Sequence, residues 1–158
     1  MTFVQTDNAL KPNGHYSQAI IHDNLIYLSG ILPFHKETGS YVEGNLKKQM
    51  LVVLDNLDCI LQAAGTDKYH VIKTVVYIPD ITLWPEANDL YSQYFGPHRP
   101  VRSIVPTNTL HFNSNIEMEV LSLIHIFDTR CFSISVLILH FGVPPVLHEW
   151  QAFSSHTG

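Results

Sequence analysis

The spacing of apolar and polar residues divides the first 123 positions of the chain into short strands and two helices. Two β-rich runs on either side of His22-Asp23-Asn24 are typical of a β-hairpin, because a short polar turn separates them. The segment from Pro33 to Gly44 carries Pro, Gly and mixed charge and predicts a loop, as does segment 1–14. The predicted strands are residues 17–21, 25–30, 71–78, 103–105 and 116–123.

Two helices are predicted from the spacing of apolar residues. Between Asn45 and Gly65 these residues recur every three or four positions, which is the stripe of an amphipathic helix. Asn45 suits the N-cap of that helix, and Gly65 suits its C-terminal end. The second helix runs from Trp84 to Phe95, with Pro85 in its first turn. The order ββαβαββ predicts an α+β domain whose two helices pack on one face of a sheet.

The composition indicates one globular domain without a nucleic-acid surface. The chain has 158 residues, of which 46% are hydrophobic and 15% charged, a balance that suits a single buried core. Nine Lys and Arg against 14 Asp and Glu give a net charge of −5, whereas nucleic-acid binding depends on clustered cations. The two cysteines are too few for a disulfide framework, and the N-terminal residues show no signal-peptide pattern. We therefore expect a cytoplasmic protein without membrane contact, with the mitochondrion as the alternative location.

The amino-acid composition of the chain changes after about residue 123. We therefore predict a domain of residues 1–123 followed by a tail of residues 124–158. Residues 127–158 contain three of the charged residues, whereas the first 126 contain 20. The hexapeptide LSLIHI at residues 121–126 is also what the end of a common transposase sequencing adapter encodes in one reading frame. Our hypothesis is that the tail is non-native translated sequence. The alternative is a genuine, divergent extension, which a continuous genomic exon would show.

Metal and covalent chemistry are not favoured. The ten histidines are scattered, without an HxxxH pair or a CxxC motif, so we expect no metal site. Cys59 lies in the apolar stripe of the first predicted helix, where packing is favoured over a nucleophilic role. The sequence contains no GxGxxG, GxxxxGK[ST] or GxSxG motif of dinucleotide, P-loop or serine-hydrolase enzymes.

Arg102 and Glu117 are the remaining candidates for chemistry. Arg102 follows a segment stiffened by Pro97 and Pro100, which suits a guanidinium that binds a planar carboxylate. A surface salt bridge is the commoner role of such a residue. Glu117 and Glu119 alternate with apolar residues, so both carboxylates project from one strand face. Either this is a solvated strand face, or one carboxylate holds a water for hydrolysis.

Eight motifs follow one another in a specific order between residues 10 and 121. They are GHYSQAI (14–20), LSGILP (28–33), ETG (37–39), a Q…VLDNL…IL.AAG pattern (49–65), VIKTVVYI (71–78), NDLY (88–91), PVRS (100–103) and IEMEV (116–120). Each motif alone is weak, but the ordered series resembles the Rid (YjgF) family of reactive-intermediate, or enamine/imine, deaminases. The resemblance implies a chorismate-mutase-like (YjgF-like) fold with a mixed sheet. It also implies a homotrimer with sites in the clefts between subunits.

The resemblance further implies a reaction that needs no cofactor. Reactive 2-imino acids or their enamine tautomers, such as 2-iminobutanoate and 2-iminopropanoate, are hydrolysed to 2-keto acids and ammonia, a role in metabolite damage control. By this resemblance, Arg102 would hold the substrate carboxylate and Glu117 would orient the attacking water. The substrate-binding residues would be Tyr16, Ser29, Gly30, Asn88 and Arg102. Such chemistry needs positioning and charge stabilisation rather than a covalent nucleophile.

Three residues depart from the family pattern and keep other functions open. His15 stands where the family usually has Pro, Ile31 where it usually has Gln, and Ile104 where the deaminase branch usually has a small residue or Cys. A chaperone-like member, or one that binds small carboxylates without turnover, is therefore an alternative. An endoribonuclease, a label that some family members carry, is less favoured because the chain is acidic.

Overall fold

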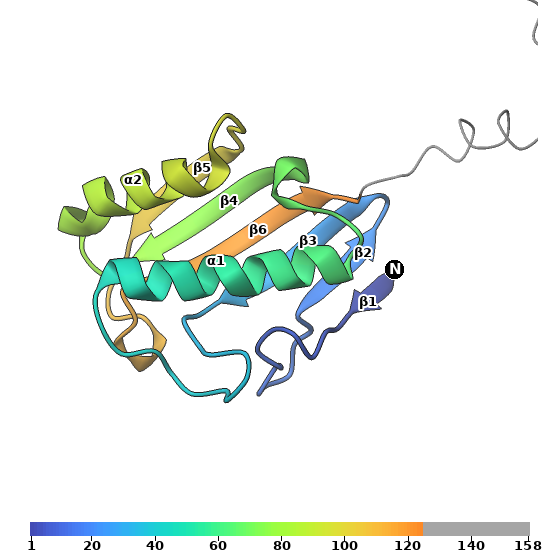
Figure 1. The fold of residues 1–158 in the computed structure, drawn as a ribbon, viewed down its shortest axis with the longest axis horizontal. Helices are drawn as coiled ribbons and strands as arrows, with labels where there is room; N and C mark the ends of the chain where they lie inside the picture. The colour runs from blue at the N-terminus through green and yellow to red at the C-terminus, as the bar shows by residue number, and fades with distance from the viewer. Residues whose placement is uncertain (125–158) are drawn as a thin grey trace, which may run out of the picture. The chain divides into compact units, whose positions relative to one another are not determined.

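The computed structural model describes residues 1–124, which form one six-stranded sheet with two helices (Figure 1). The strands are β1 (Thr2–Val4), β2 (Ala19–His22), β3 (Leu25–Ile31), β4 (Val71–Ile78), β5 (Val101–Pro106) and β6 (Glu117–Leu123). The helices are α1 (Leu46–Ala63) and α2 (Trp84–Phe95), with 3-10 turns η1 (Lys68–His70), η2 (Ile81–Leu83) and η3 (His111–Asn113). Of the predicted tail, all residues after Ile124 lie outside the described residues.

The sheet is mixed, as predicted. The strand order is β1-β2-β3-β6-β4-β5, so β6 lies between β3 and β4 although it is the last described strand along the chain. β4 and β5 are parallel and α2 lies between them in sequence, whereas the other pairs are antiparallel. The pairing of β3 with β6 shifts between Leu28 and Ile31. This β-bulge holds Ser29 and Gly30, two of the predicted site residues.

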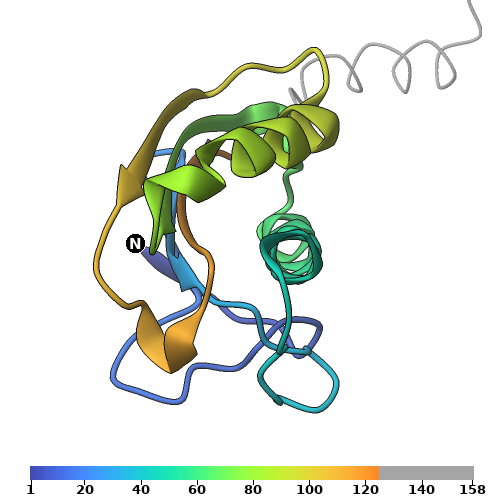
Figure 2. The ribbon, with the colours of Figure 1, turned by 90° about the vertical axis from the view of Figure 1, so that its left-hand side faces the viewer.

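Both helices pack on the same face of the sheet, which confirms the α+β prediction (Figure 2). The apolar stripe of α1 is buried, and Met50, Val53 and Leu57 have no exposed surface. Asn45 caps α1 as predicted, since its Oδ1 accepts a hydrogen bond of 3.1 Å from the backbone N–H of Lys48. No described helix covers the other face of the sheet, where Tyr27, Val101 and Val105 are exposed. We call this face of the sheet, which no described helix covers, the open face.

One strand was not predicted, and the bounds of four predicted strands, β2, β3, β5 and β6, differ from the structure by one or two residues. Residues 1–14 were expected to form a loop, but Thr2–Val4 forms β1 along the edge of β2. Three residues carry too little pattern to be recognised, and the free backbone groups of β2 supply the pairing. β5 spans Val101–Pro106 rather than 103–105, because its parallel pairing with β4 continues over its whole length.

None of the described helices is long and apolar enough to cross a membrane.

Candidate functional site

Arg102 lies on β5, at the edge of the sheet, with its side chain against α2. Its Nη2 donates a hydrogen bond of 3.0 Å to Asn88 Oδ1. Its guanidinium carbon lies 4.5 Å from the ring centroid of Tyr91 and 6.0 Å from that of Trp84. Within residues 1–124, no carboxylate lies within 4.0 Å of this guanidinium. The surface salt bridge that the sequence left open is therefore not formed among these residues.

Helix periodicity explains why three residues of α2 meet Arg102. Trp84, Asn88 and Tyr91 are spaced by four and three positions, so they lie along one side of the helix. Thr74 is the direct partner of Arg102 in the pairing of β4 with β5, and its hydroxyl lies 2.9 Å from the Tyr91 hydroxyl. Asn88 was predicted from the sequence as a site residue, whereas Tyr91, Trp84 and Thr74 were not. Their spacing with Asn88 was the available signal for the two aromatic residues.

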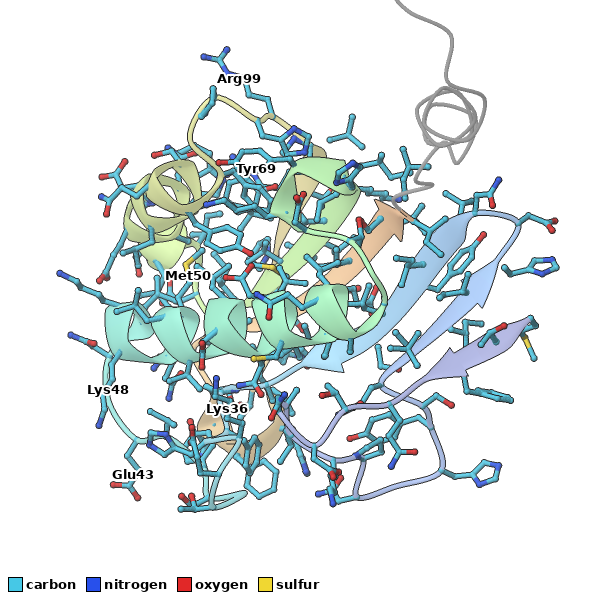
Figure 3. The ribbon with its side chains drawn as sticks, turned by 45° about the vertical axis from the view of Figure 1, so that its right-hand side comes forward. Lys36, Glu43, Lys48, Met50, Tyr69 and Arg99 are labelled. Atoms are coloured by element: carbon cyan, nitrogen blue, oxygen red, sulfur yellow. The ribbon has the colours of Figure 1, made fainter. Side chains whose placement is uncertain are left out.

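A cavity of about 420 Å³ lies beside this guanidinium. Its lining residues are Asn88, Tyr91, Ser92, Phe95, Gly96, His98, Arg99, Pro100 and Arg102. Arg99 is exposed, and its side chain extends away from the body of the domain (Figure 3). The cavity has the size of a small-molecule site, and it carries positive charge on one wall.

Glu117 projects from the opposite side of the sheet. Its neighbours Ile116 and Met118 are fully buried, and Glu117 itself is half-buried on the open face. Burial raises the pKa of the Glu117 carboxyl, the nearby Glu119 raises it further, and His111 acts in the other direction. A carboxylate with a raised pKa is a stronger base, which suits the activation of a water molecule.

Gly30 and Glu117 are in close contact. A Cβ atom at position 30 would overlap the Glu117 Oε1, so this carboxylate occupies the space that any other residue at position 30 would need. In the same bulge, the Ser29 hydroxyl donates a hydrogen bond of 2.7 Å to the Ser17 carbonyl. The Ser29 hydroxyl thus ties β3 to the segment that precedes β2.

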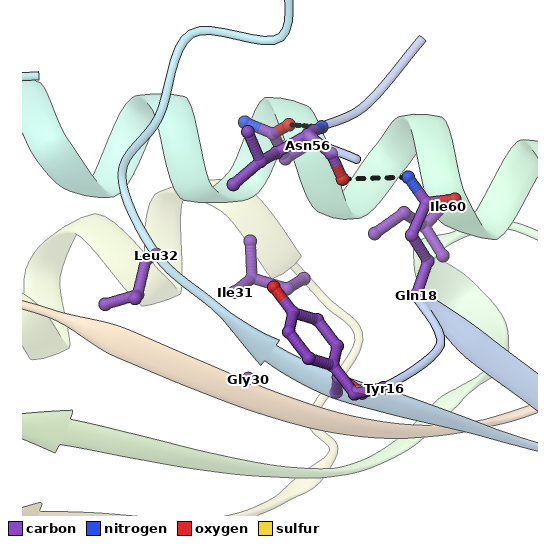
Figure 4. Close-up of a pocket in the computed structure, with 9 residues that line it drawn as sticks. Tyr16, Gln18, Gly30, Ile31, Leu32, Asn56 and Ile60 are labelled. Atoms are coloured by element: carbon purple, nitrogen blue, oxygen red, sulfur yellow. Dashed lines mark hydrogen bonds between the residues drawn. The ribbon is translucent and has the colours of Figure 1, made fainter. Parts of the chain in front are cut away.

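Tyr16, Ser29 and Gly30 line one small cavity beside α1 (Figure 4). Its volume is about 30 Å³. Such a cavity holds about one or two water molecules and no imino acid. Leu10 and Gln18 close one side, since the Gln18 side-chain amide donates a hydrogen bond of 2.9 Å to the Leu10 carbonyl. These three predicted site residues are therefore neighbours, but they do not form a substrate pocket alone.

A single chain does not bring Arg102 and Glu117 together. Arg102 contacts α2, whereas Glu117 lies on the open face. Tyr77 on β4 pairs with Glu117 on one side and with Val105 on the other. Arg102 is therefore two strands across and three residues along from Glu117. With strands about 4.8 Å apart and a rise of about 3.3 Å per residue, their backbones are separated by roughly 14 Å.

The predicted site residues thus form two groups within one chain. One group is Arg102 with Asn88, beside the larger cavity. The other joins Glu117 to the bulge of β3 and, through that bulge, to Tyr16.

The three departures from the family pattern have different surroundings. His15 is exposed. Ile31 is buried, with 7% of its surface exposed, and it lines the small cavity beside α1. Ile104 is partly buried and packs against the core on the same face as Arg102. The latter two side chains bring apolar surface, and no hydrogen-bonding side chain, to the neighbourhood of the predicted site.

Cys59 is a packing residue in this fold, as expected. It is partly buried against the core, and its Sγ lies 3.4 Å from Lys36 Nζ. Lys36 also pairs with Asp55 at 2.9 Å. Cys59 lines neither of the two cavities described above. Among residues 1–124, no group of three or more His, Cys, Asp or Glu side chains could hold a metal ion.

Comparison with known proteins gives consistent matches over this part of the chain. The family model described as Endoribonuclease L-PSP matches residues 6–124. A RutC family protein of Pyrococcus abyssi is 39% identical over 117 residues, which cover 74% of this chain and 92% of the relative. The human protein named 2-iminobutanoate/2-iminopropanoate deaminase is 34% identical over 120 residues, covering 76% of this chain and 88% of the relative.

The solved structures agree with the sequence matches. The crystal structure of a Yersinia pestis protein of the conserved Rid protein family superimposes with a TM-score of 0.76 at 36% identity. The superposition covers 78% of this chain and 98% of the Yersinia protein. The YjgF-like fold expected from the sequence is therefore confirmed.

Proposed function

The chain belongs to the Rid (YjgF, RutC) family, and from that premise we propose that it hydrolyses 2-imino acids to 2-keto acids and ammonia. 2-Iminobutanoate and 2-iminopropanoate are the proposed substrates, as in the printed name of the human relative. The proposed reaction uses no cofactor and no metal.

The main support for this proposal is the position of the Arg102 guanidinium and its lack of a carboxylate partner among residues 1–124. Its guanidinium is held by Asn88 and Tyr91 beside a cavity of about 420 Å³. Since no carboxylate of residues 1–124 pairs with it, it is available to a carboxylate from solution. A guanidinium held in one orientation suits the two-pronged binding of a planar carboxylate. A 2-imino acid has such a group next to its reactive carbon.

Hydrolysis then requires water to add to the imine carbon. In the proposed mechanism Glu117 accepts a hydrogen bond from that water and takes its proton as the new C–O bond forms. The proton passes to the nitrogen of the tetrahedral adduct. The C–N bond then breaks as the hydroxyl proton passes to the nitrogen, so that ammonia leaves and the keto group remains. The raised pKa of Glu117 supports this role, because a stronger base takes the proton more readily.

The two groups of site residues favour a site between subunits. Because Arg102 and Glu117 lie on opposite faces of one sheet, we propose that one copy supplies Arg102 and Asn88 and another copy supplies Glu117 and the bulge. The open face offers a surface for this contact, with Tyr27, Val101 and Val105 exposed. A homotrimer with three such sites is the assembly that we propose.

A coupled assay tests the function. A dehydratase acting on threonine supplies 2-iminobutanoate, and release of 2-ketobutanoate is followed in competition with a chemical imine trap. We expect the full chain to accelerate release and Arg102→Ala to abolish the acceleration. Lys47→Ala is the matched control, since it removes an exposed cation on the outer side of α1. Equal rates with and without the folded protein would refute imine hydrolysis for this substrate.

Ile31 and Ile104 favour a second candidate, a carboxylate-binding or chaperone-like protein without turnover. Binding of 2-ketobutanoate that depends on Arg102, together with no imine hydrolysis, would identify the binding protein. The Endoribonuclease L-PSP description of the family also suggests RNA cleavage. That activity predicts salt-sensitive RNA binding, which an excess of acidic residues disfavours.

The remaining proposals concern the domain and its location. We propose that residues 1–123 form the Rid domain and that residues 124–158 are a tail outside it. The family match to residues 6–124 supports this boundary. The cytoplasmic location stays a prediction, which microscopy of the tagged full chain would test.

A further inference from the structure

The Arg102 guanidinium packs against the ring of Tyr91, a residue that the proposed function has not yet given a role. Tyr91 is almost fully buried, with 7% of its surface exposed, and its ring is the nearer of the two aromatic rings to the guanidinium. The separation of 4.5 Å is within the range of a cation–π contact. Tyr91 also lines the larger cavity, so its ring and Arg102 border the same space.

A second contact holds Tyr91 in place. Its hydroxyl lies 2.9 Å from the hydroxyl of Thr74, which has no exposed surface. Thr74 is the strand partner of Arg102, so one residue of β4 lies beside Arg102 in the sheet and contacts its supporting ring through a side chain. Phe95 packs against the ring of Tyr91, with ring centroids 4.5 Å apart. The ring is thus fixed by a hydrogen bond at its tip and by packing beside it.

We infer that Tyr91, anchored by Thr74, is a positioning residue that holds the Arg102 guanidinium in the orientation needed for a substrate carboxylate. Asn88 fixes one nitrogen of the guanidinium, and the Tyr91 ring supports its plane. Together these contacts restrict a long side chain that otherwise loses considerable rotamer freedom when it binds a ligand. This inference rests on the proposed function, since it assigns Tyr91 to the same site.

The predicted kinetic effect is on KM rather than on kcat. The carboxylate is present in the bound substrate and in the transition state, so a poorly oriented Arg102 weakens both equally. We expect Tyr91→Leu to raise KM by about three- to tenfold, the range of a cation–π contact at a partly desolvated site, with kcat nearly unchanged. Tyr91→Phe keeps the ring, so its KM should stay within about threefold of the wild-type value.

A second measurement does not depend on activity. The chain has three arginines, so the side-chain Nε–Hε signals of 15N-arginine-labelled full-length protein form a small set. Arg102→Lys identifies the Arg102 signal by its disappearance. We expect the wild-type Arg102 proton to be shifted upfield by the Tyr91 ring, Tyr91→Phe to keep that shift, and Tyr91→Leu to abolish it.

Tyr94→Leu is the matched control, because Tyr94 is a partly buried tyrosine of the same helix whose hydroxyl donates a hydrogen bond to Asp58 rather than contacting Arg102. It should leave the Arg102 signal in place even if it destabilises the fold. An Arg102 signal that Tyr91→Leu does not move, or that Tyr94→Leu moves equally, would overturn the positioning role. If the wild-type chain hydrolyses no imine but the signals behave as expected, the proposed function fails and the role of Tyr91 in holding Arg102 stands.

Discussion

The carboxylate of Glu117 lies where a side chain of residue 30 would be, so Gly30 is required by its neighbour rather than by its own backbone. Gly30 is not among the residues with positive φ, and an alanine fits its backbone conformation. The atom that a Cβ would meet is the far end of the Glu117 side chain. A substitution of Gly30 by alanine can therefore disturb the Glu117 carboxylate without disturbing the backbone of the fold.

We predict that Gly30→Ala displaces the Glu117 carboxylate and lowers kcat by at least about tenfold, because a water-holding carboxylate must be correctly placed. The melting temperature should change little, since a flexible side chain can move aside. Coupled kinetics and thermal unfolding of the same samples test this. A variant with wild-type kcat would show that Glu117 has no such role.

The raised pKa of Glu117 predicts a pH dependence of stability. The folded state binds this proton more tightly than the unfolded state, so the group costs stability as the pH rises above its unfolded pKa. Glu117→Gln removes that cost and should raise the melting temperature at pH 7 by on the order of 2 °C. Below the unfolded pKa the two proteins should melt alike. A lower melting temperature for Glu117→Gln at pH 7 contradicts the prediction.

The role proposed for Glu117 also predicts how kcat falls at acidic pH, which is the acidic limb of the pH–rate profile. Water activation needs the ionised form, so kcat should fall as the pH drops through the pKa of Glu117, at a higher pH than for an ordinary glutamate. Initial rates between pH 4 and 8, with the supplying dehydratase in excess, measure this limb. Glu119→Gln is an informative comparison: it removes a neighbouring negative charge and should move the limb to lower pH.

The open face predicts how subunit contact can be broken. Val75 lies on β4 and lines a depression of about 200 Å³ on that face together with Tyr27 and Leu121. If copies pack there, Val75→Lys buries a charge and should produce monomers without deaminase activity. Light scattering gives the mass, and Leu51→Lys on the exposed outer side of α1 is the control. A trimeric, active Val75→Lys would exclude this part of the face from the contact.

The N-cap of α1 gives a prediction about the stability of the fold. The Asn45 side chain accepts the hydrogen bond from Lys48 N–H that begins α1. Asn45→Ala leaves this N–H without its partner and should lower the free energy of unfolding by about 1 kcal/mol. Asn45→Ser keeps a capping oxygen and should lose much less. Urea unfolding of both variants compares them directly.

Much of the fold follows from local patterns in the sequence. The apolar spacing of 45–65 and the end signals Asn45, Gly65 and Pro85 placed both helices, because helix periodicity and caps depend on nearby residues. β4 was placed equally well, because the predicted strand 71–78 has the same bounds as Val71–Ile78. The strand β1 was missed, because a three-residue edge strand depends on pairing with distant residues rather than on its own pattern.

The candidate site was likewise predicted only as far as local sequence patterns allow. The sequence by itself determined which residue types were worth attention, since a guanidinium after a stiff segment and two carboxylates on one strand face are recognisable locally. Only the tertiary structure decided that Arg102 and Glu117 lie on opposite faces of the sheet, that Tyr91 and Thr74 support the guanidinium, and that Gly30 makes room for a carboxylate. The physical reason is that these contacts join residues far apart in the chain. Strand order, register and a single bulge set them, and none of the three leaves a local signal.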